Sequence, residues 1–170
     1  MILTVTLLFP GYASAAGNAI VRVAVPADAV DPGEQFTISI NVEPNNEIAG
    51  VQFKLSFNPG LITIDSIVEG NLLSQDGAST FFNAGTIDNQ SGTITGVFSA
   101  IITPGQSVSS GGTLAIITMT AGTDEGSCPL TLSNVIVGDA ISQTVPVSIV
   151  NGAVSIGQSS GDTTPSGGGG

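Results

Sequence analysis

The stretch IAGVQFKLSFNPGLITI, Ile48–Ile64, alternates between apolar and non-apolar residues until the turn residues Asn58-Pro59-Gly60. Successive side chains of an extended chain point to opposite faces, so this pattern predicts a β-strand with one buried face. The apolar face would carry Val51, Phe53, Leu55 and Phe57. The opposite face would carry Gly50, Gln52, Lys54 and Ser56. The strand therefore needs a core on one side and leaves the other side for solvent or a partner.

The same alternation recurs at intervals of about ten residues, with Gly, Pro, Asn and Asp between the apolar runs. Candidate strands are residues 20–25, 36–42, 50–57, 62–68, 79–83, 92–100, 113–121, 130–137 and 145–156. No amphipathic helical pattern competes with them. The chain is therefore predicted to be an all-β antiparallel sandwich or barrel.

The length of 170 residues fits one folded domain, which we place at residues 18–156. Residues 1–16 combine an apolar run with small residues, as the apolar and cleavage regions of a secretory signal peptide do. The basic residues that usually precede such a run are missing, so we expect this leader to be truncated. The run is too short for a membrane span, and we expect no membrane insertion once it is removed. Residues 157–170 are rich in Gly, Ser, Thr and Pro and are predicted to be a flexible linker.

Composition argues against most catalytic and nucleic-acid functions. The chain has 2 Lys and Arg residues against 13 Asp and Glu residues, so it lacks the basic patches that neutralise phosphates. It has no histidine, and its one cysteine, Cys128, has no histidine base to activate it. We therefore expect a protein that is not an enzyme, with Cys128 as a small apolar core residue.

Metal and sugar sites are the remaining small-ligand alternatives. The acids cluster at turns, where Asp28 with Asp31, or Asp124 with Glu125, could contribute to a calcium site, although hydrated turn acids are the simpler reading. A carbohydrate-binding module commonly offers exposed Trp or Tyr rings. This chain has no Trp, and its single tyrosine, Tyr12, lies in the predicted leader.

Three segments of the chain, taken together, carry a recognisable pattern. The first is GEQFTISINVEPNNEIAGVQFKLSFNPGLITIDSIVEG, residues 33–70. The second is GGTLAIITMTA, residues 111–121, and the third is VPVSIVNGAVSI, residues 145–156. Each motif alone is weak, but in their order and spacing they resemble the cohesin domain family over nearly the whole expected domain.

The resemblance implies a fold, a partner and a site. Cohesins are nine-stranded antiparallel jelly-roll sandwiches that bind dockerin modules through one flat sheet face, and the calcium belongs to the dockerin rather than to the cohesin. We therefore expect no cofactor here and a dockerin-bearing protein as partner. Carried over to this sequence, the partner-binding positions are Gly50, Gln52, Lys54, Asn83 and Val97. Gly50 and Gln52 replace polar or acidic residues of the best-known subclass, and Asn83 replaces a tyrosine.

Several alternatives stay open at this stage. Gln52 and Lys54 could be ordinary solvent-facing strand residues. The domain could instead bind carbohydrate, associate with polysaccharide, or assemble with copies of itself in a cell-surface structure. Asn89-Gln90-Ser91 is a weak N-glycosylation sequon in a polar loop. The predicted leader favours a secreted, extracellular protein, and the resemblance to cohesins implies that it is associated with the cell surface and takes part in scaffolding.

Overall fold

The computed structural model describes residues 17–157, which form twelve β-strands and no helix. The predicted leader at 1–16 lies outside the described residues, and so does the predicted linker apart from Gly157. The strands are β1 (Ala19–Ala24), β2 (Gln35–Glu43), β3 (Gly50–Ser56), β4 (Ile62–Glu69), β5 (Thr80–Asn83), β6 (Thr86–Asp88), β7 (Thr93–Ile101), β8 (Gly112–Ala121), β9 (Gly126–Gly138), β10 (Thr144–Val145), β11 (Val147–Val150) and β12 (Gly152–Ile156).

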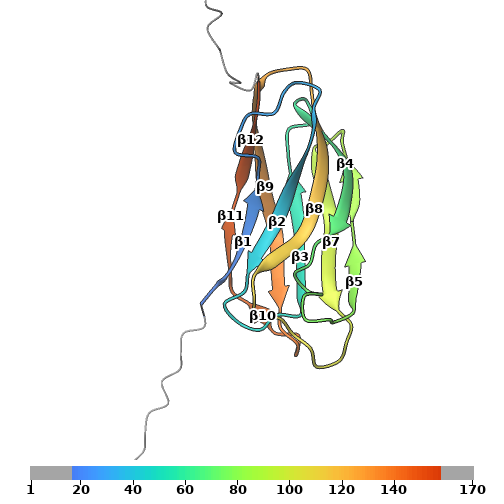
Figure 1. Ribbon diagram of the computed structural model, residues 1–170, viewed down its shortest axis with the longest axis vertical. Coiled ribbons are helices and arrows are strands. Elements are labelled where there is room, and N and C mark those ends of the chain that lie inside the picture. The colour runs from blue at the N-terminus through green and yellow to red at the C-terminus, as the bar shows by residue number, and fades with distance from the viewer. Residues whose placement is uncertain (1–16, 158–170) are drawn as a thin grey trace, which may run out of the picture.

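The strands form two sheets that pack face to face (Figure 1). The five-stranded sheet has the order β11-β1-β2-β8-β4. The seven-stranded sheet has the order β10-β9-β3-β7-β5, with β12 paired to β9 and β6 paired to β7. The predicted all-β sandwich is confirmed, and β3 lies at the centre of the larger sheet.

The core between the sheets consists of the apolar side chains that the predicted alternation places on the inner face of each sheet. In β2, Phe36, Ile38, Ile40 and Val42 are buried. In β3, Val51, Phe53 and Leu55 are buried against them from the other sheet. Because each sheet hides one face in this shared core, the opposite face of each sheet is left exposed.

The last candidate strand, 145–156, is divided into three strands in the structure. Pro146 has no backbone N–H to donate, and it lies where the chain leaves the seven-stranded sheet after β10 and enters the five-stranded sheet as β11. The Asn151-Gly152 turn then returns the chain to β9 as β12. The pairing of β11 with β1 is parallel, and so is the isolated bridge between Val30 and Ile156, so the expectation of a purely antiparallel body is corrected there.

A polar contact joins the two sheets at the β4 edge. The Ser99 hydroxyl of β7 is 1 % exposed and donates to Oε1 of Glu69 in β4 at 2.7 Å. The Thr80 hydroxyl of β5 donates to Oε2 of the same carboxylate at 3.1 Å. One glutamate therefore holds two strands of the opposite sheet.

We expect Ser99→Ala to lower the free energy of unfolding by about 1.5–3 kcal/mol, because it removes a hydrogen bond to a charged group from a buried position. Urea denaturation of the purified domain measures this change. Ser56→Ala, at a half-buried outward position of β3, is the matched control. Equal midpoints for the two variants would contradict the role of the Glu69 contact.

Candidate functional site

The candidate site is the outer face of the seven-stranded sheet around β3. Gly50 and Lys54 are half-buried and Gln52 is exposed, while Val51, Phe53 and Leu55, which alternate with them, are buried. The structure thus places Gly50, Gln52 and Lys54 on one face, as the alternation predicted. Asn83, at the end of β5, is also exposed.

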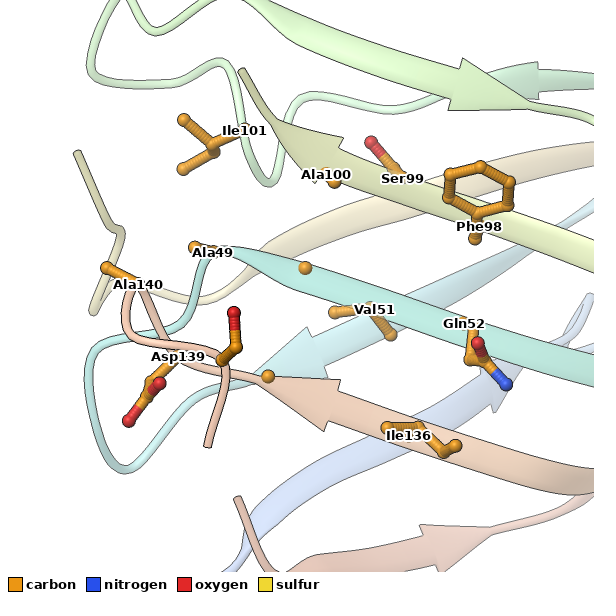
Figure 2. Close-up of a pocket in the computed structure, with 13 residues that line it drawn as sticks. Ala49, Val51, Gln52, Phe98, Ser99, Ala100, Ile101, Ile136, Asp139 and Ala140 are labelled. Carbon is orange, nitrogen blue, oxygen red and sulfur yellow. The ribbon is translucent and has the colours of Figure 1, made fainter. Parts of the chain in front are cut away.

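Two rows of four paired residues each cross this face. The eight residues of the two rows, named in the next two sentences, together with Lys54 are called the β3 face. One row runs from β9 to β5 through Ile136, Gln52, Phe98 and Asn83. The other row runs through Gly138, Gly50, Ala100 and Phe81. Figure 2 shows Gln52 between Phe98 of β7 and Ile136 of β9.

The second row protrudes less from the sheet than the first because its central residues have small side chains or none. Gly138, Gly50 and Ala100 form the floor of a shallow hollow of about 360 Å³ whose lining includes Phe98 and Ile136 (Figure 2). Ile136 is 47 % exposed and Phe81 is 54 % exposed, and the Phe81 and Phe98 rings pack with centroids 5.6 Å apart. Exposed apolar side chains around a rigid, small-residue floor are typical of a protein-binding surface.

Val97 does not lie on this face, so its predicted placement is wrong. Its side chain is 0 % exposed and belongs to the core. Thr95 and Gly96 together face the single residue Lys54 of β3, which is a β-bulge, and Gly96 has φ 73°. The extra residue shifts the alternation by one position, and Phe98 becomes the outward residue in place of Val97. The glycine inside the predicted strand was the signal that could have found this shift.

The described residues offer little for catalysis or metal binding. Between Gly17 and Gly157 no group of three or more His, Cys, Asp or Glu side chains could hold a metal ion, and neither turn pair, Asp28 with Asp31 or Asp124 with Glu125, belongs to one. Cys128 is buried, and burial raises the pKa of its thiol, so the thiolate that would act as a nucleophile is disfavoured. Over the same residues, no helix has the length and apolar character needed to cross a membrane.

Asn89, the residue of the sequon, makes a two-point contact with β4. Its Oδ1 accepts the N–H of Ile64 at 2.8 Å, and its Nδ2 donates to the Ile64 carbonyl at 3.0 Å. β4 is an edge strand, so the side chain satisfies backbone groups that another strand would otherwise satisfy. In a glycosylated asparagine the side-chain amide is trans, so the sugar takes the place of the Nδ2 hydrogen that lies on the same side as Oδ1. The two-point contact with Ile64 uses that same hydrogen. Glycosylation at Asn89 stays a prediction, and it requires this contact to be lost.

We expect Asn89→Asp to lower the free energy of unfolding by about 1–3 kcal/mol, because the aspartate loses the donor and turns a carboxylate oxygen towards the Ile64 carbonyl. Gln90→Glu adds the same charge to the exposed neighbouring position and should leave stability nearly unchanged. Thermal unfolding of both variants at one pH compares them. A loss of similar size in Gln90→Glu would assign the effect to charge rather than to the contact.

Comparisons with known proteins agree with this architecture. The family model described as "Cohesin domain" matches residues 21–156. A search of curated protein sequences finds no match.

Solved structures are similar over most of the chain. A non-cellulosomal cohesin from the archaeon Archaeoglobus fulgidus is 16 % identical with a TM-score of 0.61, covering 84 % of this chain and 93 % of that one. A type I cohesin–dockerin complex from Clostridium thermocellum contains a chain that is 15 % identical with a TM-score of 0.64, covering 82 % and 99 %. A type II cohesin from the cellulosome of Acetivibrio cellulolyticus is 14 % identical with a TM-score of 0.64, covering 81 % and 95 %. Identities this low show a shared fold. Because the family model spans most of the sequence, the chain belongs to the cohesin domain family.

Proposed function

We propose that this domain is a non-catalytic binding module whose β3 face receives a dockerin. The observation that carries the proposal is the hollow over Gly50, Ala100 and Gly138, flanked by apolar side chains on a domain of this family. Among the structurally similar chains, one comes from a type I cohesin–dockerin complex. That likeness supports a dockerin as the class of partner.

The geometry suits an elongated partner element such as a helix. The two rows of the β3 face extend over four strands, so apolar contacts can be made along a line rather than at one point. The backbone beneath them is fixed by hydrogen bonds on both sides of β3, so little order has to be imposed on binding. The calcium of the complex belongs to the dockerin, and the domain itself needs no cofactor.

The wider role follows from this binding. A dockerin-bearing enzyme or surface protein would be attached through the domain to a scaffold outside the cell. A part in polysaccharide degradation would come from the attached partner rather than from this chain.

Calorimetric titration of a panel of dockerins, each with calcium and with a chelator, tests the proposal. We expect saturable, one-to-one binding by at least one dockerin in calcium, and loss of that binding when the chelator unfolds the dockerin's calcium loops. Retention on insoluble polysaccharide is measured in parallel and should be absent. Silence of the whole panel together with polysaccharide retention would contradict the proposed function and favour a carbohydrate-binding module.

A further inference from the structure

Charge is distributed unequally between the two sheets. The sequences of β3, β5, β7 and β9 contain no Asp or Glu, although the chain has 13 such residues. The five-stranded sheet, in contrast, carries Glu43, Asp65 and Glu69. Lys54 on β3 and Arg22 on β1 are the two cations of the chain, one in each sheet. These four strands therefore carry no acid and a single positive charge, while Asp139, just after β9, lines the hollow over Gly50 (Figure 2) and Asp88 lies in β6.

The backbone on both sides of Lys54 is bulged. On the β7 side, Thr95 and Gly96 face Lys54. On the β9 side, Asn134 and Val135 face Phe53, and Asn134 has φ 49°. Bulges on both neighbours of one strand at nearly the same level change the directions of the side chains there, a device found next to functional sites.

The bulges leave space beside the lysine. A second hollow, of about 250 Å³, is lined by residues that include Gln52, Lys54, Gly96, Phe98 and Asn134. A Cβ built on Gly96 would meet no atom within 4 Å, so this side of the hollow is open. The space is large enough for one side chain of a partner.

Lys54 has no competing partner within the domain. Among residues 17–157 its ammonium makes no hydrogen bond or ion pair. A carboxylate brought into the hollow would therefore gain a cation without breaking an internal contact. Because the lysine is only half-buried, little of its hydration is lost before the partner arrives.

We propose that the hollow beside Lys54 takes an Asp or Glu side chain of the protein partner, and that Lys54 determines specificity for partners that present this carboxylate next to apolar residues. The inference rests on the proposed function that the β3 face binds the partner, and it adds the chemistry that the partner must carry. The negative charge of the rest of the domain would repel an acidic partner docked elsewhere.

The first arm of the test uses a dockerin that binds the wild-type domain. Lys54→Glu should weaken binding about 30-fold or more, with a slower association rate at low salt, and Lys54→Gln should have a smaller effect of the same sign. Arg22→Glu is the matched control, because it makes the same change in net charge on the other sheet, where Arg22 is exposed on β1. It should change affinity by no more than about two-fold, because distant exposed charges are screened.

Charge reversal in the dockerin identifies the carboxylate. Each Asp and Glu outside the calcium loops is changed to Lys and paired with Lys54→Glu. One such variant should restore most of the lost affinity, while it weakens binding to the wild-type domain. Equal effects of Lys54→Glu and Arg22→Glu, or rescue by none of the reversals, would overturn the inference while leaving dockerin binding intact.

The second arm does not depend on a dockerin. The isotope-labelled domain is titrated with an amphipathic helical peptide carrying one Glu on its apolar side, and with Gln and Lys versions of that peptide. Amide shifts at Lys54, Gly96 and Asn134 with the Glu peptide alone support the inference even if no dockerin binds, in which case only the proposed function fails. Identical shifts for the three peptides, or none at these positions, would contradict it.

Discussion

Gly50→Gln should abolish dockerin binding, with a loss of affinity of at least about 100-fold. The floor of the hollow is low because position 50 has no side chain, and a glutamine there would occupy the space that the partner enters. The fold should tolerate the change. A Cβ on Gly50 would lie 3.5 Å from the Ser99 carbonyl oxygen and 3.7 Å from the Ala100 Cβ, which are ordinary contacts.

Thr37→Gln is the control for this prediction, because Thr37 is an exposed strand residue on the outer face of the five-stranded sheet. Calorimetry with the same dockerin should give wild-type affinity for Thr37→Gln. Thermal unfolding should show that both variants remain folded. A folded Gly50→Gln domain with wild-type affinity would show that the partner does not enter this hollow.

Gly92→Ala should cause a large loss of stability, about 2–5 kcal/mol. Gly92 has φ 67°, a conformation that costs an alanine about 1–2 kcal/mol. A Cβ there would also lie 2.2 Å from the Phe57 carbonyl oxygen and 2.7 Å from Cδ of Pro59, and relieving such overpacking adds about 1–3 kcal/mol.

Gly105→Ala separates the cost of the backbone conformation from the cost of overpacking. Gly105 has φ 72°, close to that of Gly92, but a Cβ there would meet nothing within 4 Å. Urea denaturation should therefore show a loss of only about 1–2 kcal/mol for Gly105→Ala. Equal losses in the two variants would mean that the turn before β7 moves away from Phe57 and Pro59 at little cost.

The sequence predicted the sandwich and the position of β3 because both depend on a two-residue period. Phe36 to Val42 and Val51 to Leu55 alternate without interruption, so one count of positions fixes which side chains are buried. Gly50, Gln52 and Lys54 were placed correctly by that count.

Counting alternate positions gave the wrong outward residue where a β-bulge breaks the two-residue alternation. The bulge at Thr95 and Gly96 put Phe98 rather than Val97 on the outer face, and sequence alternation cannot place a bulge without knowing the partner strand. Ile136 was missed for a related reason, since the bulge at Asn134 changes the count within β9.

Long-range polar contacts also could not be predicted from the sequence. Asn89 was read as a sequon, yet its amide contacts Ile64, which is 25 residues away in the chain. Glu69 gave no sign that it would accept hydrogen bonds from Ser99 and Thr80. Such contacts depend on how two sheets meet, which local patterns do not encode.

Self-assembly of the domain remains the main alternative to dockerin binding. Edge strands can pair with other chains, and the chain has a single lysine to protect them. At one edge, however, the Asn89 side chain already occupies the backbone groups of Ile64 in β4. Analytical ultracentrifugation of the purified domain over a range of concentrations separates the two readings. A single monomeric species favours the binding module.

Mapping of amide chemical shifts on adding a dockerin tests the central claim most directly. We expect the largest changes at Gly50, Gln52, Phe98, Ala100 and Ile136, and only small changes at outward positions of β2 and β8. Changes that gather on the five-stranded sheet, or at the strand edges, would contradict the assignment of the β3 face as the binding surface.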